Sequence, residues 1–76
     1  MATIEIKSEI TGSVAKILHK VGDAVVEDDP IIILESMKME IPVTSTEDGE
    51  ITEILVQVGD TVAEGSVVAR VTEKEN

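Results

Sequence analysis

The chain of 76 residues is long enough for one small domain, and the absence of cysteine excludes disulfide bonds and thiolate metal sites. A net charge of −10 and the lack of Phe, Tyr and Trp argue against nucleic-acid binding, which uses clustered basic side chains and aromatic stacking. The same acidity disfavours anionic membranes, and no apolar run approaches the roughly 20 residues of a membrane span. Since residues 1–5 do not resemble the start of a signal peptide, we expect a soluble cytoplasmic protein.

Apolar and polar residues alternate with period two along most of the chain, which predicts β-strands. The predicted strands span residues 3–7, 13–19, 24–26, 31–35, 39–44, 50–57, 61–63 and 67–72. Pro42 inside one of them predicts an edge strand or a bulge, because proline cannot donate to a ladder. No window has a convincing helical face. The expected fold is therefore all-β, with about eight short strands in a sandwich or barrel.

The sequence contains an internal repeat. Residues 4–35 align with residues 41–72 without a gap, at an offset of 37, and ten of the 32 pairs are identical. The strongest signal is a Val-Gly-Asp turn that recurs at residues 21–23 and 58–60, which implies a repeated backbone conformation. Two units are too few for a solenoid. We expect the two halves to close face to face about a pseudo-two-fold axis, each covering the apolar side of the other, within a single domain over residues 1–76.

Lys38 is the central residue of the link between the two repeats. A hairpin at this link brings residue 35 close to residue 41, and the two-fold axis then requires residue 72 to lie close to residue 4. Both ends of the chain are therefore expected on one side of the domain, with the hairpin on the opposite side. This arrangement places the lysine as far from the ends as a small domain permits.

The repeat also predicts which side chains form the core. Ile33 aligns with Arg70 in the second repeat. Because arginine prefers contact with water, Ile32 and Leu34 should point inward more firmly than Ile33. The expected core comprises Ile4, Ile6, Val14, Ile17, Val21, Val25, Ile32, Leu34, Ile41, Val43, Ile51, Ile54, Val58, Val62, Val68 and Val71.

Met37 and Lys38 occupy the centre of the predicted hairpin. A two-residue hairpin turn usually contains Asn-Gly or a similar pair, because both central residues need a positive φ angle. Met-Lys is a poor choice by this criterion, and a local rule broken at a symmetric centre indicates a functional site. The alternative interpretation is a longer loop that carries an ordinary surface lysine.

The segment Glu35-Ser36-Met37-Lys38-Met39 resembles the attachment motif of the biotinyl/lipoyl attachment domain family, whose usual form is Glu-Ala-Met-Lys-Met. The resemblance covers about residues 3–72, because the glycines and the Val-Gly-Asp turns also fit the family pattern. It implies a flattened β-barrel, or barrel-sandwich hybrid, of two four-stranded antiparallel sheets related by pseudo-two-fold symmetry. The chain is similar to a free-standing biotin carboxyl carrier, with residues 36–40 as the attachment hairpin.

The resemblance implies that a biotin protein ligase attaches biotin covalently to the side-chain nitrogen of Lys38. The biotin then carries CO2 from a biotin carboxylase site to a carboxyltransferase site, and the chain itself is a non-catalytic carrier. Met37 and Met39 flank the lysine, and either recognition by the ligase and the biotin ring or gap filling beside the hairpin would explain them. Glu35 is a candidate for recognition by the ligase, whereas Glu40 is better explained as a residue that solvates the tip.

Other functions stay open at this point. A lipoyl carrier has the same fold, and lipoate on Lys38 is the alternative cofactor, although a methionine on each side of the lysine favours biotin. An unmodified barrel-sandwich module with a structural role gives no reason for the Met-Lys-Met tip. An enzyme is disfavoured, because one histidine and scattered acids do not supply a nucleophile, a base and an oxyanion site. The adjacent acids at residues 27–29 indicate a solvated turn rather than a metal site.

Overall fold

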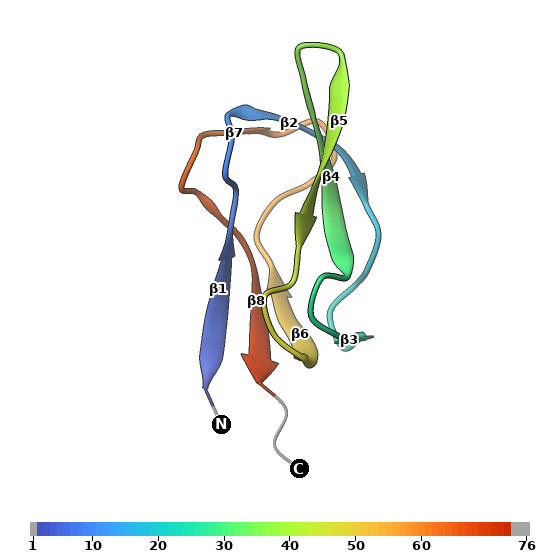
Figure 1. Ribbon diagram of the computed structural model, residues 1–76, viewed down its shortest axis with the longest axis vertical. Helices are drawn as coiled ribbons and strands as arrows, with labels where there is room; N and C mark the ends of the chain where they lie inside the picture. Colours follow the sequence, from blue (N-terminus) through green and yellow to red (C-terminus); the bar gives the residue numbers. More distant parts are fainter. Residues whose placement is uncertain (1, 74–76) are drawn as a thin grey trace.

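The computed structural model describes residues 2–73, which form eight β-strands and no helix that is long and apolar enough to cross a membrane. The strands are β1 Thr3–Lys7, β2 Gly12–Ile17, β3 Ala24–Val25, β4 Pro30–Ser36, β5 Met39–Thr44, β6 Gly49–Ile54, β7 Thr61–Val62 and β8 Val67–Glu73. They build two four-stranded sheets, in the orders β1-β8-β6-β3 and β5-β4-β2-β7 (Figure 1). All neighbouring strands in them are antiparallel. The predicted all-β fold of two antiparallel sheets is confirmed, and the predicted strands differ from the observed ones only at their ends.

The pseudo-two-fold symmetry is visible in the strand order. Moving each strand four places along the chain converts the order β1-β8-β6-β3 into β5-β4-β2-β7. The expectation that each half would form its own layer against the other is wrong, because β1 and β3 of the first repeat share a sheet with β6 and β8 of the second. Each sheet therefore contains two strands from each repeat.

The β4–β5 hairpin and the ends of β1 and β8 lie at opposite ends of the long axis of the molecule (Figure 1). Thr3 pairs with Thr72 and Ile4 pairs with Val71, which confirms the predicted closeness of residues 4 and 72. The molecule measures 40 × 19 × 18 Å, so the hairpin tip is far from both strand ends. Pro42 lies in β5, which is an edge strand as predicted.

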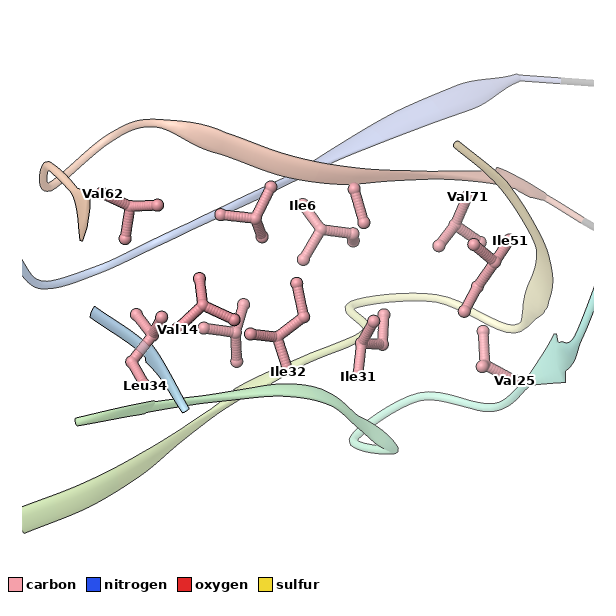
Figure 2. Packing of buried hydrophobic residues seen from close by; sticks show 12 residues of the cluster. Ile6, Val14, Val25, Ile31, Ile32, Leu34, Ile51, Val62 and Val71 are labelled. Atoms are coloured by element: carbon pink, nitrogen blue, oxygen red, sulfur yellow. The ribbon is translucent and has the colours of Figure 1, made fainter. Parts of the chain in front are cut away.

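The core lies between the two sheets (Figure 2). Its buried members are Ile6, Val14, Val25, Ile31, Ile32, Leu34, Val43, Ile51, Val62, Val68, Ala69 and Val71. Most of these belong to the predicted core, and the other predicted members in the strands, Ile4, Ile17, Ile41 and Ile54, are half-buried. Each fully buried isoleucine or leucine stabilises the fold by about 1.5–3 kcal/mol.

Val21 and Val58 were expected in the core and are instead 59% and 63% exposed. Both lie in turns, where the following glycine has a positive φ angle. The backbone rather than the valine side chain joins each turn to the neighbouring strand, since the N–H of Gly22 donates to the Ile51 carbonyl. The repeated valine therefore marks a repeated turn and not a repeated core position.

Ile31 and Ala69 are fully buried, although neither belongs to the expected core. The pairing of β4 with β5 shifts between Pro30 and Ile32, so Ile31 lies at a bulge and points inward with Ile32. Ala69 lies on the same face of β8 as Val71, and the equivalent irregularity falls at Val68, which is skipped between the paired residues Val67 and Ala69. Ile33 is half-buried, which confirms that it points inward less firmly than its neighbours.

Candidate functional site

Lys38 lies at the tip of the β4–β5 hairpin (Figure 1). The two strands pair as far as Ser36 and Met39, so only Met37 and Lys38 form the turn. Their φ angles are 52° and 66°, the combination of two positive angles that a type I′ turn requires. The longer-loop interpretation is therefore wrong. Left-handed backbone costs a non-glycine residue about 1–2 kcal/mol, so this turn holds two residues in an unfavourable conformation.

The side chains of the tip are open to solvent. Met37 is 92% exposed and Met39 is 62% exposed, and Lys38 is exposed between them. Within residues 2–73, no hydrogen bond or salt bridge holds the Lys38 amine. Neither methionine fills a gap in the core, so the gap-filling interpretation finds no support. The arrangement presents a primary amine that an enzyme can reach from outside.

β2 supports the base of the hairpin. Ser13 pairs with Glu35, and a Cβ atom added at Gly12 would lie 2.8 Å from the Glu35 carbonyl oxygen and 3.4 Å from Cβ of Ser36. Gly12 therefore lets β2 pass directly against the strand that leads to the lysine. The sequence pattern alone did not predict that Gly12 belongs to the site. Its recurrence as Gly49 was the available signal, because Gly49 allows an even closer approach at the opposite end.

Glu35 and Glu40 are cross-strand partners just below the tip, and both are exposed. Like charges directly opposite each other destabilise a pair of strands. The two carboxylates therefore create a negative surface on the outer face of the hairpin, a few residues from Lys38. This surface suits a partner with basic side chains.

His19 and Asp23 form a polar contact away from the tip. In the turn before β3, Nδ1 of His19 lies 3.1 Å from Oδ2 of Asp23. The backbone N–H of Lys20 donates to the same carboxylate at 3.1 Å. This bond is the main reason why the pKa of Asp23 is lowered, and the His19 contact adds to the shift. Across residues 2–73, no group of three or more His, Asp or Glu side chains is arranged to hold a metal ion.

Comparison with known proteins points to one family. The family model described as "Biotin-requiring enzyme" matches residues 5–71. The biotinylated protein TB7.3 homolog of Mycobacterium leprae (strain TN) is 35% identical over 68 residues, which cover 90% of this chain and 96% of that protein.

Two larger proteins are also similar to the chain. The biotin-dependent acyl-coenzyme A carboxylase alpha3 subunit of M. leprae (strain TN) is 36% identical over 66 residues, which are 87% of this chain and 11% of that subunit. The crystal structure of the Kluyveromyces lactis urea carboxylase matches with a TM-score of 0.90 and 38% identity, over 95% of this chain and 6% of that one. The chain thus spans nearly all of one relative and a small part of the two carboxylases.

Proposed function

The chain belongs to the family of biotin-requiring enzymes, and we propose that it is a biotin carrier in which Lys38 holds the cofactor through an amide bond. The observation that carries the proposal is the exposed Lys38 amine on a two-residue turn with two positive φ angles. The pairing of β4 with β5 and β2 fixes the direction in which this turn projects. A structural role alone gives no reason to keep methionine and lysine in this conformation.

Attachment requires an acyl transfer to the lysine. The neutral amine of Lys38 attacks the carbonyl carbon of an activated biotin, the C–N bond forms, and the activating group leaves with the electrons of its bond to that carbon. The amine must also give up a proton. No described side chain forms a hydrogen bond with Lys38 that would accept this proton, so a biotin protein ligase supplies the base. The product has one positive charge fewer at the tip.

Biotin held by Lys38 would supply the group that carries CO2 between a biotin carboxylase site and a carboxyltransferase site. The contribution of this chain is positional and non-catalytic, because it holds the attachment point on a rigid hairpin away from the rest of the domain. Tethering makes each delivery effectively intramolecular, so weak docking to each enzyme suffices. Both enzymes, like the ligase, belong to this proposal as partners, and the cytoplasm is the compartment that we expect for all of them.

The residues beside the lysine have separate parts in the proposal. Met37 and Met39 offer exposed, polarisable side chains to the ligase and to the sulfur-containing biotin ring. Glu35 lies on the outer face of β4 and offers a carboxylate to the ligase. Lipoate is the less favoured cofactor, because the names of both mycobacterial relatives refer to biotin.

Intact-mass measurement after incubation with a biotin protein ligase, biotin and ATP tests the proposal. The wild-type chain should gain the mass of one biotinyl group, whereas Lys38→Arg should gain none. Lys20→Arg is the matched control, since Lys20 is an exposed lysine just before the turn that precedes β3, away from the tip, and its substitution should leave the adduct in place. An adduct of lipoyl mass on protein isolated from its source, or an adduct that survives Lys38→Arg, would contradict the proposal.

A further inference from the structure

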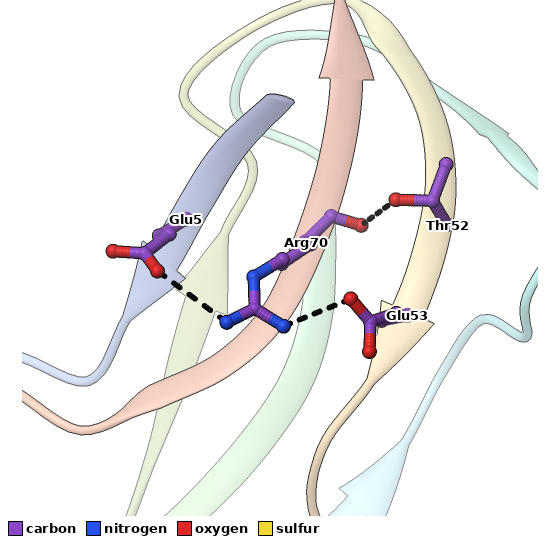
Figure 3. Close-up of polar contacts among 4 residues, drawn as sticks. All are labelled: Glu5, Thr52, Glu53 and Arg70. Carbon is purple, nitrogen blue, oxygen red and sulfur yellow. Dashed lines mark hydrogen bonds and ion pairs between the residues drawn. The ribbon is translucent and has the colours of Figure 1, made fainter. Parts of the chain in front are cut away.

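The outer faces of the two sheets differ at positions that the pseudo-two-fold axis makes equivalent. On the β1-β8-β6 sheet, Arg70 lies between two glutamates (Figure 3). Its Nη1 donates to Oε1 of Glu53 at 2.8 Å, and its Nη2 lies 3.5 Å from Oε2 of Glu5. Three neighbouring strands are thereby joined by a charged network on the solvent side of this sheet.

We call the sheet β5-β4-β2-β7, which carries the β4–β5 hairpin, the hairpin sheet. Its equivalent positions are Pro42, Ile33 and Lys16. Ile33 pairs with Pro42 on one side and with Lys16 on the other, so the three residues lie side by side across β5, β4 and β2. Pro42 is exposed and Ile33 is half-buried. We call these three residues the hairpin-sheet patch. The fold does not dictate the apolar character of Ile33 and Pro42, because the same positions on the other sheet hold an ionic network.

The patch continues towards the hairpin tip along both strands. Ile33 and Glu35 are two residues apart on β4, and Pro42 and Glu40 are two residues apart on β5, so each pair shares one face of the sheet. The two glutamates therefore lie between the patch and Lys38. A partner that covers this face and reaches Lys38 therefore contacts both the apolar surface and the negative charge beside it.

A recess lies at the edge of the patch. Pro42 lines a cavity of about 160 Å³ between β1 and β5, together with Ile6, Ile10 and Ile41. The cavity is also lined by Lys7, Glu9, Thr44 and Thr46, so its wall is partly apolar and partly polar. A side chain of a partner that fills such a recess can contribute much of the binding energy. The cavity thus offers an anchor point beside Pro42, the cross-strand partner of Ile33.

We infer that the hairpin-sheet patch docks the ligase that acylates Lys38, with an apolar side chain of the ligase against Ile33 and Pro42 and basic side chains facing Glu35 and Glu40. This inference rests on the proposed function. The ligase is the occupant because it must select one lysine before any cofactor is present, and only the protein surface distinguishes that lysine. Enzymes that act later bind a chain that already carries the biotin ring, which they can recognise directly.

Kinetics of biotin incorporation test the inference. Ile33→Arg and Pro42→Glu each introduce the residue that stands at the equivalent position on the other sheet, and Arg70→Ile is the mirror-image control. Initial rates should be measured against the concentration of the substrate protein, with a biotin protein ligase at saturating biotin and ATP. Ile33→Arg and Pro42→Glu should raise KM about tenfold with kcat unchanged, as expected when one central docking contact is lost. Arg70→Ile should leave both constants unchanged.

Each variant should first be checked by thermal unfolding. If Ile33→Arg does not fold, Pro42→Glu decides the question, because the Pro42 side chain is exposed and β1 already carries a glutamate at the equivalent position. Wild-type KM values for the folded variants would overturn the inference. It would also be overturned if biotinylation stayed normal while carboxylation of the attached biotin by a biotin carboxylase slowed, since the patch would then serve a different enzyme. Failure of the wild-type chain to accept biotin would contradict the proposed function itself.

Discussion

Glu35 on β4 and Glu40 on β5 face each other directly, so that the hairpin carries two like charges on one side. The equivalent pair at the other end of the molecule is Thr72 and Thr3, which are uncharged. The fold therefore accepts a neutral pair at this position. The acidic pair weakens the hairpin in exchange for a negative surface beside Lys38.

Replacing Glu40 by lysine should stabilise the protein. The change turns a repulsive cross-strand pair into an attractive one, which is worth about 0.2–1 kcal/mol. Thermal unfolding at low ionic strength should show a higher midpoint, and the increase should shrink when salt screens the charges. Glu40→Gln is the control that removes the repulsion without adding an attraction, so its midpoint should lie between the two. An unchanged or lower midpoint for Glu40→Lys would show that the pair does not repel.

The turn itself should become more stable when its two residues are replaced by Asn-Gly. Met37→Asn combined with Lys38→Gly supplies residues that tolerate positive φ angles, so most of the roughly 1–2 kcal/mol per residue should be recovered. Each kilocalorie corresponds to a rise of about 4–8 °C in the unfolding midpoint of a domain of this size. The same variant should accept no biotin. A midpoint at or below that of the wild type would mean that the turn is not under strain.

Adding a methyl group at Gly12 should destabilise the base of the hairpin. The new Cβ atom would lie 2.8 Å from the Glu35 carbonyl oxygen, and backbone cannot move aside as a flexible side chain can. Gly12→Ala should therefore cost about 1–3 kcal/mol in urea unfolding. Gly49→Ala should cost more, because its Cβ would lie only 2.2 Å from the Thr72 carbonyl oxygen. Equal stability of Gly12→Ala and the wild type would contradict the close approach of β2 to β4.

Truncation of Ile31 should distinguish the observed core from the core that strict alternation predicts. Ile31→Ala removes a fully buried side chain and should cost about 2–5 kcal/mol. Val21→Ala should change the stability by less than about 0.5 kcal/mol, since Val21 is largely exposed. Urea unfolding of the two variants measures both values. The opposite order would favour a core without the bulge in β4.

Acid should remove the stabilising effect of Asp23. The folded state lowers the pKa of this carboxyl below its ordinary value of 3.8, first through the Lys20 N–H and then through His19. A lowered pKa means that the unfolded chain takes up the proton more readily, so the stabilisation is complete above pH 3.8 and disappears as the pH falls through the lower folded value. Asp23→Asn should therefore be less stable than the wild type at neutral pH but not in strong acid. Urea unfolding across this range measures the difference, and Glu27→Gln, the same charge change on an exposed turn residue, should show no such loss.

Symmetry in the sequence predicted more of this structure than alternation did. The pairing of residue 4 with the end of the second repeat followed from the repeat alone, because any hairpin at residues 36–40 must have a counterpart at the chain ends. The hydrophobic pattern does not distinguish repeats that each form their own sheet from repeats that exchange strands, because both arrangements bury the same apolar residues. Burial of Ile31 was equally hidden, because it depends on a bulge that strict alternation does not include.

The candidate site was predicted more completely than its support. Lys38 was identified from an unfavourable turn sequence, and the structure places it in a turn with two positive φ angles. Gly12 was overlooked because its importance lies in a contact with β4, which is distant in sequence. The alignment of the repeats already paired the apolar Ile33 with the charged Arg70. Only the sheet order shows that this difference distinguishes the outer surfaces of the two sheets.

The order of synthesis gives the exchanged strands a further consequence. β8 is the last of the eight strands, yet it lies between β1 and β6 and joins them into one sheet. While a ribosome is still making residues 67–73, the inner face of the hairpin sheet has no complete layer against it, although Lys38 and its motif have long been made. An enzyme that recognises the folded surface around Lys38 would therefore not modify chains in which β8 has not yet joined its sheet, and modification would report that both sheets are complete.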